Sequence, residues 1–490
     1  MSLDFIPIAT AQRLVVLRQV PGQDRVLTPA ALGFLTELQT RFGHKLHALM
    51  VARDRRQERF DRGEMPDYLA DTTDTRKGIW TAAPMPPVLL DRRAEIVGPL
   101  ARDAMEAALG SGARVFVADQ EDRTSHSFTA VIAGHANLLD HRDGPLDQVG
   151  PEPALLILRP RALHGTEANV MIGGHGMSAA LFDFGLDIFH NGRALAATGR
   201  GPFYELAKLE SHREARFWNE VFLFAEDRVG LAHGTIKATV CIESLNAAYE
   251  MDEIVWELRD HIAAMSLNRA NYTASYIRAM RRHADRTLPG NTPHDRAFLA
   301  TCAARLVKVC HRRGILAIGE GEPEHEVRIG FDGSRGDPVM TMAVFAEEMT
   351  GPNQMRVPRQ GWRIEPEMLI QPHKGDATQA MLEAEIAIAI AEVAAWLSGR
   401  PARMDLADLA RMRIWQWRQH GAEVDGMRLT TDRLAEAIQA EVVELLATHG
   451  AHGFHRGHFA PAARLLHEAV MGTAPEPAAI PAYPVLNAVD

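Results

Sequence analysis

The stretch FYELAKLESHREARFWNEVFLFAEDRVGLAHGTIKATVCIES, residues 203–244, decides the fold. It begins and ends with short apolar runs, 203–209 and 236–242, which have the length and composition of buried strands. Between them, residues 212–225 carry apolar side chains at the spacing of an amphipathic helix. A strand, a helix and a second strand in this order predict a βαβ unit with two parallel strands.

The same alternation of apolar runs and helical patterns extends over the chain from about residue 93. Further strands are predicted at 114–118, 154–158 and 315–318, and further helices at 102–109, 251–264 and 295–312. Three weaker strand candidates lie at 181–189, 272–277 and 341–345. Together these segments allow eight strands, which is the number in a (β/α)8 barrel.

The two ends of the chain have a different pattern. Residues 28–60 carry leucines and phenylalanines at helical spacing, and Thr28-Pro29 is a suitable helix start. Past residue 375 the strand pattern stops, and helices are predicted at 377–397, 406–420, 431–448 and 461–471. We therefore expect a helical N-terminal part and a separate helical C-terminal domain beside the sheet.

Composition excludes several classes of protein. The 490 residues carry 53 basic and 63 acidic side chains, a formal net charge of −10, with no basic block of the kind that binds nucleic acid. The three cysteines form no zinc or disulfide pattern, which fits a reducing compartment. The N-terminal sequence lacks the features of a secretion signal, and no apolar run is long enough to cross a bilayer. These features predict a cytoplasmic protein without nucleic-acid or membrane partners.

Ionisable residues follow the five better-defined strands. The run VFVA leads into Asp119, Glu121 and Asp122, ALLIL into Arg159 and Arg161, and the three other strands end near Lys208 and Glu210, Glu243, and Glu320. Each alone is an ordinary loop residue, but parallel strands bring their C-terminal ends to one rim of a barrel. Carboxylates there suit Mg²⁺, and arginines suit an anionic substrate or a developing oxyanion. The pattern predicts a barrel enzyme for a small anionic substrate.

At these same segments the sequence resembles the malate synthase family, in its shorter A-type form. The similar stretches are LLDRRAEIVGP (89–99), VFVADQED (115–122), PALLILRPRALH (153–164), FDFGLDIFHN (182–191), residues 201–244, YEMDEIVWELRDH (249–261), KVCHRRGILAIG (308–319), GFDG (330–333) and RIWQW (413–417). The likeness spans nearly the whole chain in order.

The resemblance implies an α/β fold: a (β/α)8 TIM barrel at 89–375, with an N-terminal helical clasp at 1–88 and an all-helical C-terminal domain at 376–490. It implies a Claisen condensation of acetyl-CoA with glyoxylate, which gives malate and CoA, with Mg²⁺ as cofactor. In that chemistry a base removes a methyl proton, an arginine stabilises the enolate, and Mg²⁺ polarises the aldehyde.

Carried over residue by residue, the resemblance places the enolate-stabilising arginine at Arg159 and a metal carboxylate at Glu243. Asp119, Glu121 and Asp122 match an acidic loop that supports the metal. Arg161 matches the second arginine of an Arg-x-Arg pattern and is a candidate substrate contact. The alternatives are a rim salt bridge for Arg159 and a buried structural ion pair for Glu243.

Three positions depart from the family pattern. The second metal aspartate is replaced by Asn271, which can still offer a carbonyl oxygen to Mg²⁺ or to substrate but brings no charge. The ungapped match of the catalytic base is Arg403, so that Asp405 or Asp408 nearby would have to serve, unless both are ordinary first-turn helix acids. The loop after Gly319 is shortened, which removes segments that help to bind acyl-CoA.

These departures leave three hypotheses open. The chain is a malate synthase-like enzyme, or a diverged paralogue that acts on another 2-oxo acid, another acyl-CoA or a malyl-CoA-like thioester, or a non-catalytic homologue.

Overall fold

The structure is a computed structural model that describes residues 14–144, 152–290, 297–472 and 482–486, so that the first 13 residues lie outside it. At its centre, eight parallel strands close into a barrel in the order β10-β11-β2-β3-β4-β7-β8-β9. The strands are β2 (Ala94–Gly98), β3 (Val115–Asp119), β4 (Leu155–Arg159), β7 (Phe203–Leu206), β8 (Lys237–Ile242), β9 (Ile262–Leu267), β10 (Leu316–Gly319) and β11 (Gly333–Arg335). The predicted barrel is confirmed.

The barrel strands form from continuous apolar runs, as expected for parallel strands that are covered on both faces. Every residue of β3, β8 and β9 is buried. Strand pairing sets which side chains meet at the rim: Asp119, the last residue of β3, lies opposite Arg159, the last residue of β4. We call the rim formed by the C-terminal ends of the eight strands the barrel mouth.

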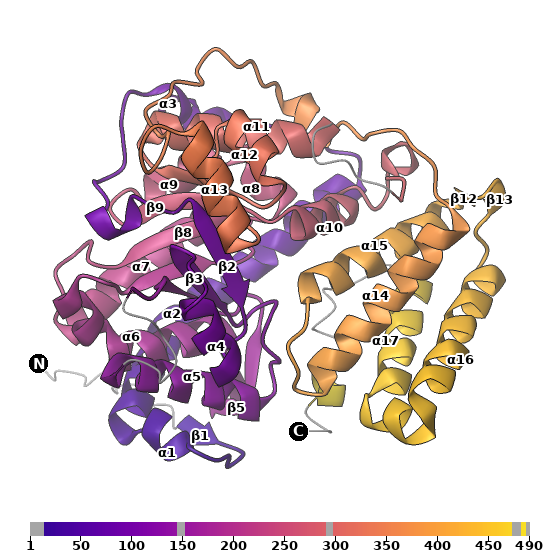
Figure 1. Ribbon diagram of the computed structural model, residues 1–490, viewed down its shortest axis with the longest axis horizontal. Coiled ribbons are helices and arrows are strands. Elements are labelled where there is room, and N and C mark those ends of the chain that lie inside the picture. Colours follow the sequence, from indigo (N-terminus) through magenta and orange to yellow (C-terminus); the bar gives the residue numbers. More distant parts are fainter. Residues whose placement is uncertain (1–13, 145–151, 291–296, 473–481, 487–490) are drawn as a thin grey trace, which may run out of the picture.

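Helices surround the barrel, as Figure 1 shows. They are α4 (Arg102–Leu109), α5 (Phe128–Asp143), α6 (Ala179–Thr198), α7 (His212–Val229), α8 (Leu245–Tyr249), α9 (Met251–Glu257), α10 (Arg269–Ala279), α11 (Ala297–Arg313), α12 (Pro323–Ile329) and α13 (Pro338–Glu348). Shorter helical elements in the connections are α1 (Gln23–Val26), α3 (Thr73–Lys77), η1 (Ala70–Thr72), η2 (Pro87–Leu89), η3 (Ala284–Arg286) and η4 (Pro366–Ile370).

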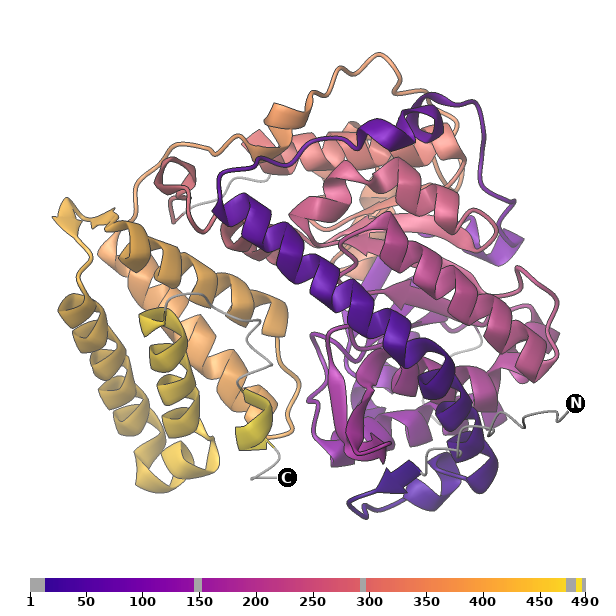
Figure 2. The ribbon, with the colours of Figure 1, turned by 180° about the vertical axis from the view of Figure 1, so that it is seen from behind.

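The long N-terminal helix α2 (Pro29–Asp61) crosses the outside of the barrel, as Figure 2 shows. Thr28 caps it, because its hydroxyl accepts a hydrogen bond from the backbone N–H of Ala31. Its buried face packs against α6 and α7, with the ring of Phe42 edge-on to those of Phe217 and Phe224. In the C-terminal half of α2, Arg53 donates to the carbonyl of Lys208, which places this half beside the barrel mouth.

A small antiparallel sheet follows β4, which the sequence pattern did not predict. It joins β1 (Leu14–Val16), β5 (Thr166–Ile172) and β6 (His175–Ser178) in the order β1-β5-β6. Its strands mix buried and exposed residues irregularly, and a register shift interrupts β5 against β6. Neither feature produces a regular alternation of apolar and polar residues in the sequence.

The C-terminal helices lie together beside the barrel (Figure 1). They are α14 (Gln379–Leu397), α15 (Met404–His420), α16 (Thr431–Arg456) and α17 (Phe459–Met471), with a short hairpin of β12 (Glu423–Val424) and β13 (Met427–Arg428). Helix α15 packs against α10 of the barrel, and the indole N–H of Trp417 donates to the carbonyl of Leu288. At the other end of α15, the backbone N–H of Met404 donates to the carbonyl of Asp122, which places the start of this helix at the barrel mouth.

Three weaker strand predictions are wrong. Residues 181–189, 272–277 and 341–345 lie inside helices α6, α10 and α13. The barrel instead uses β2, β9 and β11, and the predicted helix 251–264 ends at Glu257, before β9 begins at Ile262. Short apolar runs of five to nine residues fit a buried helix face as well as a strand, so periodicity alone does not separate them.

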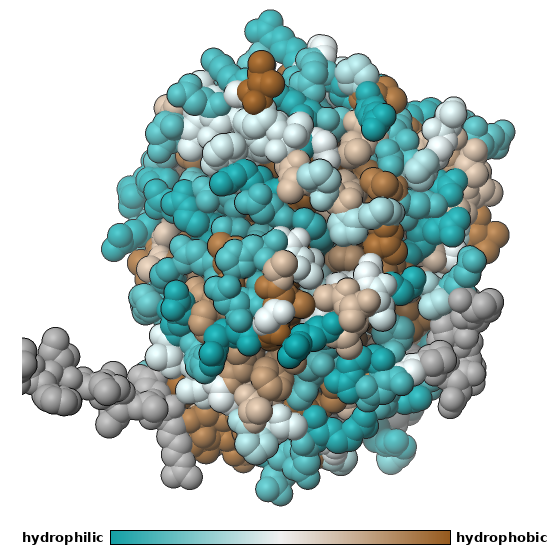
Figure 3. Space-filling model, turned by 90° about the vertical axis from the view of Figure 1, so that its left-hand side faces the viewer, coloured by the Kyte–Doolittle hydropathy of each residue, from teal (hydrophilic) through white to brown (hydrophobic). Residues whose placement is uncertain are grey.

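The outer surface is mainly hydrophilic on the face drawn in Figure 3, where apolar side chains are scattered among polar ones. Among the described residues, none of the helices combines the length and the apolar character that crossing a membrane requires.

Candidate active site

Arg159 lies at the centre of the barrel mouth and is almost fully buried. Its Nη2 donates to Asp122 Oδ2 at 2.8 Å and to Glu243 Oε1 at 2.7 Å, and its Nη1 donates to Glu205 Oε1 at 2.9 Å. Burial alone would lower the pKa of this guanidinium, but Glu243, Asp119 and Asp122 raise it well above its ordinary value. Arg159 is therefore a permanently charged group to which acids from three other strands, or from the loops after them, are bound.

Glu243 and Asn271 meet beside Arg159. The amide Nδ2 of Asn271 donates to Glu243 Oε1 and to Asp122 Oδ2, both at 2.8 Å. Asn271 reaches this place because Asn268 caps α10 and accepts a hydrogen bond from the Asn271 backbone N–H. The two predicted metal residues thus lie together, and the acidic loop supplies a third oxygen-bearing side chain through Asp122.

Lys208 closes the outer side of this cluster. Its Nζ lies 2.8 Å from Glu121 Oε1 and 2.8 Å from Asp122 Oδ1, and its backbone N–H donates to Glu243 Oε2 at 2.7 Å. Lys208 has a left-handed backbone, φ 51°, which turns its amide towards Glu243 just past the end of β7. The sequence pattern predicted that Lys208 lies near the C-terminal end of a strand, but it was not among the predicted site residues.

The acidic loop is built around Asp119. Its Oδ1 accepts hydrogen bonds from the backbone N–H groups of Glu121 and Asp122, so the loop turns tightly after β3. Glu121 Oε2 accepts from the backbone N–H of Ala162, which ties this loop to the one after β4. Burial raises the pKa of Asp119 to about 7, against the opposing effect of Arg159.

A second layer of ion pairs lies below the mouth, inside the barrel. Glu205 of β7 binds both Arg159 and Arg335, and Arg335 also contacts Glu95, whose other oxygen accepts from Arg92. All five side chains are buried. Glu205 and Arg335 were not predicted from the sequence. For Glu205, the available signal was a charged residue inside the apolar run FYEL.

Arg161 points away from this cluster. Its guanidinium binds Asp183 through Nε at 2.9 Å and Nη2 at 2.7 Å, and binds Glu167 through Nη1 at 3.0 Å. Asp183 also accepts the backbone N–H of Arg161. These bonds hold the loop after β4 in place, and the expectation that Arg161 contacts substrate stays a prediction.

The two candidate bases on α15 are both in ion pairs. Asp405 is fully buried and accepts from the Nε and Nη2 of Arg403 at 3.0 and 2.8 Å; Arg123 lies 3.7 Å away. Burial would raise the pKa of Asp405, but Arg403 and Arg123 lower it below its usual range. Asp408 faces another side, where Arg278 and Arg411 bind it. A catalytic role for either aspartate stays a prediction.

Glu320 follows β10 on the same side of the mouth as Asp405. Its Oε1 lies 4.0 Å from Nη2 of Arg403, and its Oε2 is buried without a hydrogen-bond partner among the described residues. Burial and the charge of Asp405 raise the pKa of Glu320. From the sequence, Glu320 was expected on the rim, without an assigned role.

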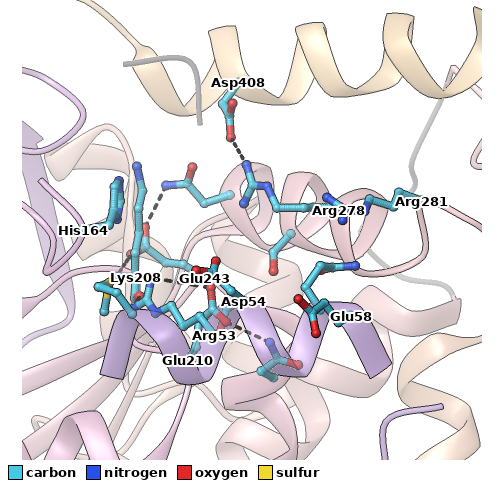
Figure 4. A pocket seen from close by; sticks show the side chains of 16 residues that line it. Arg53, Asp54, Glu58, His164, Lys208, Glu210, Glu243, Arg278, Arg281 and Asp408 are labelled. Carbon is cyan, nitrogen blue, oxygen red and sulfur yellow. Dashed lines mark hydrogen bonds and ion pairs between the residues drawn. The ribbon is translucent and has the colours of Figure 1, made fainter. Parts of the chain in front are cut away.

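A cavity of about 490 Å³ adjoins the cluster of Arg159, Glu243 and Asn271 on the side of α2. Figure 4 shows Arg53 and Glu58 projecting from α2, Lys208 and Glu243 at the mouth, and Asp408 above them on α15. This volume lies within the range of small-molecule sites, about 300–1,000 Å³. The cavity gives small polar molecules a route to Glu243 and Asn271.

Comparisons with known proteins agree in naming one family. The family description "Malate synthase, TIM barrel domain" matches residues 155–341, and "Malate synthase, N-terminal domain" matches residues 13–74. The chain is 35% identical to "Malate synthase" of Myxococcus xanthus, over 96% of this chain and 95% of that protein. It is also 35% identical to "Malate synthase A" of Escherichia coli (94% and 95%) and to "Malate synthase, glyoxysomal" of Zea mays (92% and 90%).

Proposed function

Since this chain belongs to the malate synthase family, we propose that it condenses acetyl-CoA with glyoxylate to give malate and CoA. The observation that carries the proposal is the position of Arg159. A buried guanidinium is held at the centre of the barrel mouth by carboxylates from three other strands or their loops, next to the oxygen-bearing side chains of Glu243 and Asn271. The reaction needs a fixed cation beside a site for a small oxo acid.

The first step of the proposed reaction forms an enolate. A base takes a proton from the acetyl methyl group, the C–H electron pair becomes the carbon–carbon double bond, and negative charge moves to the thioester oxygen. Arg159 supports this step because a preorganised donor in a dry site stabilises developing charge better than water does. Its Nε lies 3.2 Å from Oδ1 of Asp119, so the guanidinium acts as a fixed positive charge beside the enolate oxygen.

The second step joins the two substrates. The enolate carbon attacks the aldehyde carbon of glyoxylate, and the aldehyde oxygen takes up a proton to give malyl-CoA. Water then hydrolyses the thioester, which releases malate and the CoA thiol. Lys208 lines the cavity, and its ammonium offsets the charges of Glu121 and Asp122, which would otherwise repel the anionic glyoxylate.

The residues at the mouth fit Mg²⁺, although with one charge fewer than the family pattern supplies. Glu243, Asp122 and Asn271 converge here, but it is the amide nitrogen of Asn271 that faces the two carboxylates. Turning this amide over would bring its oxygen, a ligand type that Mg²⁺ accepts, beside the carboxylate of Glu243. Burial raises the pKa of Glu243, although Arg159 acts in the opposite direction. The charged form of this carboxylate is therefore incompletely stabilised, and an added cation would stabilise it further. We propose Glu243 and the side-chain oxygen of Asn271 as the ligands. When bound, Mg²⁺ would polarise the aldehyde of glyoxylate.

One observation favours a second candidate substrate. The cavity of about 490 Å³ is much larger than a two-carbon oxo acid and extends to Arg278 and Arg281. A longer 2-oxo acid with a second carboxylate would place that group near these arginines. The second candidate is therefore condensation with a larger 2-oxo acid, or cleavage of the corresponding thioester.

A thiol-release assay tests both candidates. Purified protein is mixed with acetyl-CoA and glyoxylate, with pyruvate, or with 2-oxoglutarate, in Mg²⁺ and in EDTA, and hydrolysis of malyl-CoA is measured in parallel. Mg²⁺-dependent release with glyoxylate supports the proposal, and release only with a longer acid or from malyl-CoA supports the second candidate. No release under any condition would make the chain a non-catalytic homologue and contradict both.

We further propose that the protein acts in the cytoplasm on these small molecules, without nucleic-acid or membrane partners. The acidic net charge of −10 and the lack of a membrane-crossing helix among the described residues support this. The division into a clasp at 1–88, a barrel at 89–375 and a helical domain at 376–490 is likewise proposed; the position of α2 and of α14–α17 supports it.

A further inference from the structure

The carboxylates at the barrel mouth differ in how many of their oxygens are already bound. Asp119 and Glu121 accept backbone N–H groups, and Asp405 accepts the guanidinium of Arg403. Hydrogen bonds from cations or amides also reach the three remaining acids of the cluster, which are Asp122, Glu205 and Glu243. A carboxylate bound in this way is a weak base, because each bond stabilises its charged form.

Glu320 differs from all of these. Its Oε2 is buried without a hydrogen-bond partner among the described residues, and the nearest approach to Arg403, through Oε1, is 4.0 Å. The glutamate follows the last residue of β10, at the C-terminal end of a barrel strand, where barrel enzymes place their reacting groups. About a quarter of the Glu320 side chain is exposed, and no hydrogen bond holds Oε2, so rotation of the side chain can bring this oxygen to a bound molecule.

The backbone of Glu320 is held firmly. Its carbonyl accepts a hydrogen bond from Nη1 of Arg269, whose Nη2 binds Glu326. Gly319 and Gly321 flank it, and a Cβ at either would meet the Glu326 carboxylate, at 2.0 and 2.6 Å. These glycines are therefore required for the carboxylate of Glu326 to lie under the loop, and the loop presents Glu320 from a fixed base.

Charged groups from several elements face Glu320. They are Arg403 and Asp405 of α15, Arg123 of the loop after β3, Arg335 of β11, and Glu326 of α12. Burial and the charge of Asp405 raise the pKa of Glu320, while Arg335, Arg123 and Arg403 oppose the rise. A carboxylate with a raised pKa is a stronger base than an exposed one, which suits proton abstraction.

We propose that Glu320 is the base that removes the methyl proton of the acyl-CoA substrate. The proposal rests on the function proposed above. The proton moves from the methyl carbon to a carboxylate oxygen of Glu320, the C–H electron pair forms the enolate double bond, and the displaced carbonyl electrons lie on the thioester oxygen. Arg403 then has a positioning role, because its bond to Asp405 keeps that acid occupied. The neighbouring Glu326 also has an unpartnered Oε2 among the described residues, but Arg269 binds its Oε1.

The test compares Glu320→Gln with Glu322→Gln, which removes an exposed carboxylate two residues further along the loop that caps no backbone group. Each protein is assayed for thiol release with acetyl-CoA, glyoxylate and Mg²⁺, and for solvent deuterium incorporation into the acetyl methyl group. We expect kcat to fall by about 100-fold or more in Glu320→Gln, with deuterium incorporation lost, and to stay within about twofold in Glu322→Gln. KM should change little.

The variant Glu320→Asp separates a base from a structural residue. It keeps the carboxylate on a shorter side chain, so we expect partial activity with a displaced acidic limb of the kcat–pH profile and an unchanged Tm. If the wild type is active and Glu320→Gln keeps the same kcat, the inference about Glu320 is overturned but the proposed function is not. A wild type that releases no thiol overturns the function and the inference together. An equal loss of kcat in Glu320→Gln and Glu322→Gln would also overturn the inference, because activity would then depend on the loop as a whole and not on the carboxylate of Glu320.

Discussion

Arg159 and Glu243 lie 2.7 Å apart, Nη2 to Oε1, although their strands β4 and β8 are separated in the barrel by β7. The pair therefore joins the ends of two strands that are not neighbours, and Asn271 and Asp122 complete the same hydrogen-bonded group. A salt bridge in this position binds the ends of strands together and places a cation beside candidate metal ligands. From the sequence, Arg159 and Glu243 could form either a structural ion pair or part of a reactive site. This geometry is compatible with both alternatives.

The variant Arg159→Ala should lose thiol release and should also be less stable. Removing one partner of a buried pair leaves uncompensated charges, which costs about 3–5 kcal/mol in the free energy of unfolding. Urea denaturation at neutral pH measures this loss. As a control, Arg216→Ala removes an exposed ion pair with Glu257 and should cost less than about 1 kcal/mol. Equal stability of the two variants would contradict the central role of Arg159.

The variant Asn271→Asp should bind Mg²⁺ more tightly than the natural chain. A carboxylate there adds a charged ligand beside Glu243, but without metal it repels Glu243 and Asp122 instead of donating to them. We expect a lower Tm in EDTA and a larger rise in Tm on adding Mg²⁺.

The control for this experiment is Asn246→Asp, which adds the same charge to the same cavity near Glu210. Its Mg²⁺-dependent rise in Tm should not exceed that of the natural chain. A rise of equal size in both variants would show that the cavity binds Mg²⁺ by charge alone and not at Glu243.

The variant Asp183→Asn should show a pH-dependent loss of stability. Burial would raise the pKa of Asp183, but Arg161 and His135 lower it to about 2, below the ordinary value of about 3.9. Because the folded pKa is the lower one, the contribution is present above about pH 4 and is lost as the pH falls towards 2. Urea denaturation at pH 7 and pH 3.5 should give a smaller difference between variant and wild type at the lower pH. A difference independent of pH would refute the ion pair.

The variant Gly319→Ala should disturb the loop that carries Glu320. The added Cβ would lie 2.0 Å from Oε2 of Glu326, so either that carboxylate or the loop must move. We expect a lower Tm and a loss of thiol release that approaches that of Glu320→Gln. Gly361→Ala meets nothing within 4 Å and serves as the matched control. Unchanged activity in Gly319→Ala would mean that the loop position does not matter.

Much of the fold followed from local pattern. Helices α4 and α7 begin where the spacing of apolar residues predicts, because one side of each is buried along its length. Strand β9 escaped prediction because its sequence IAAMSL also fits a buried helix, and only pairing with β8 and β10 selects the strand. The small β1-β5-β6 sheet depends on a pairing across more than 150 residues, which no local pattern contains.

By itself, the sequence determined that charged residues follow the strands, and the family resemblance directed attention to Arg159 and Glu243. Only the tertiary structure decided what each charged residue contacts. Arg159 forms ion pairs with Asp122, Glu205 and Glu243. Arg161 instead pairs with Asp183, and Asp405 pairs with Arg403. The physical reason is that a carboxylate's basicity and a cation's availability depend on their partners and burial. Those partners come from strands and helices far apart in the chain.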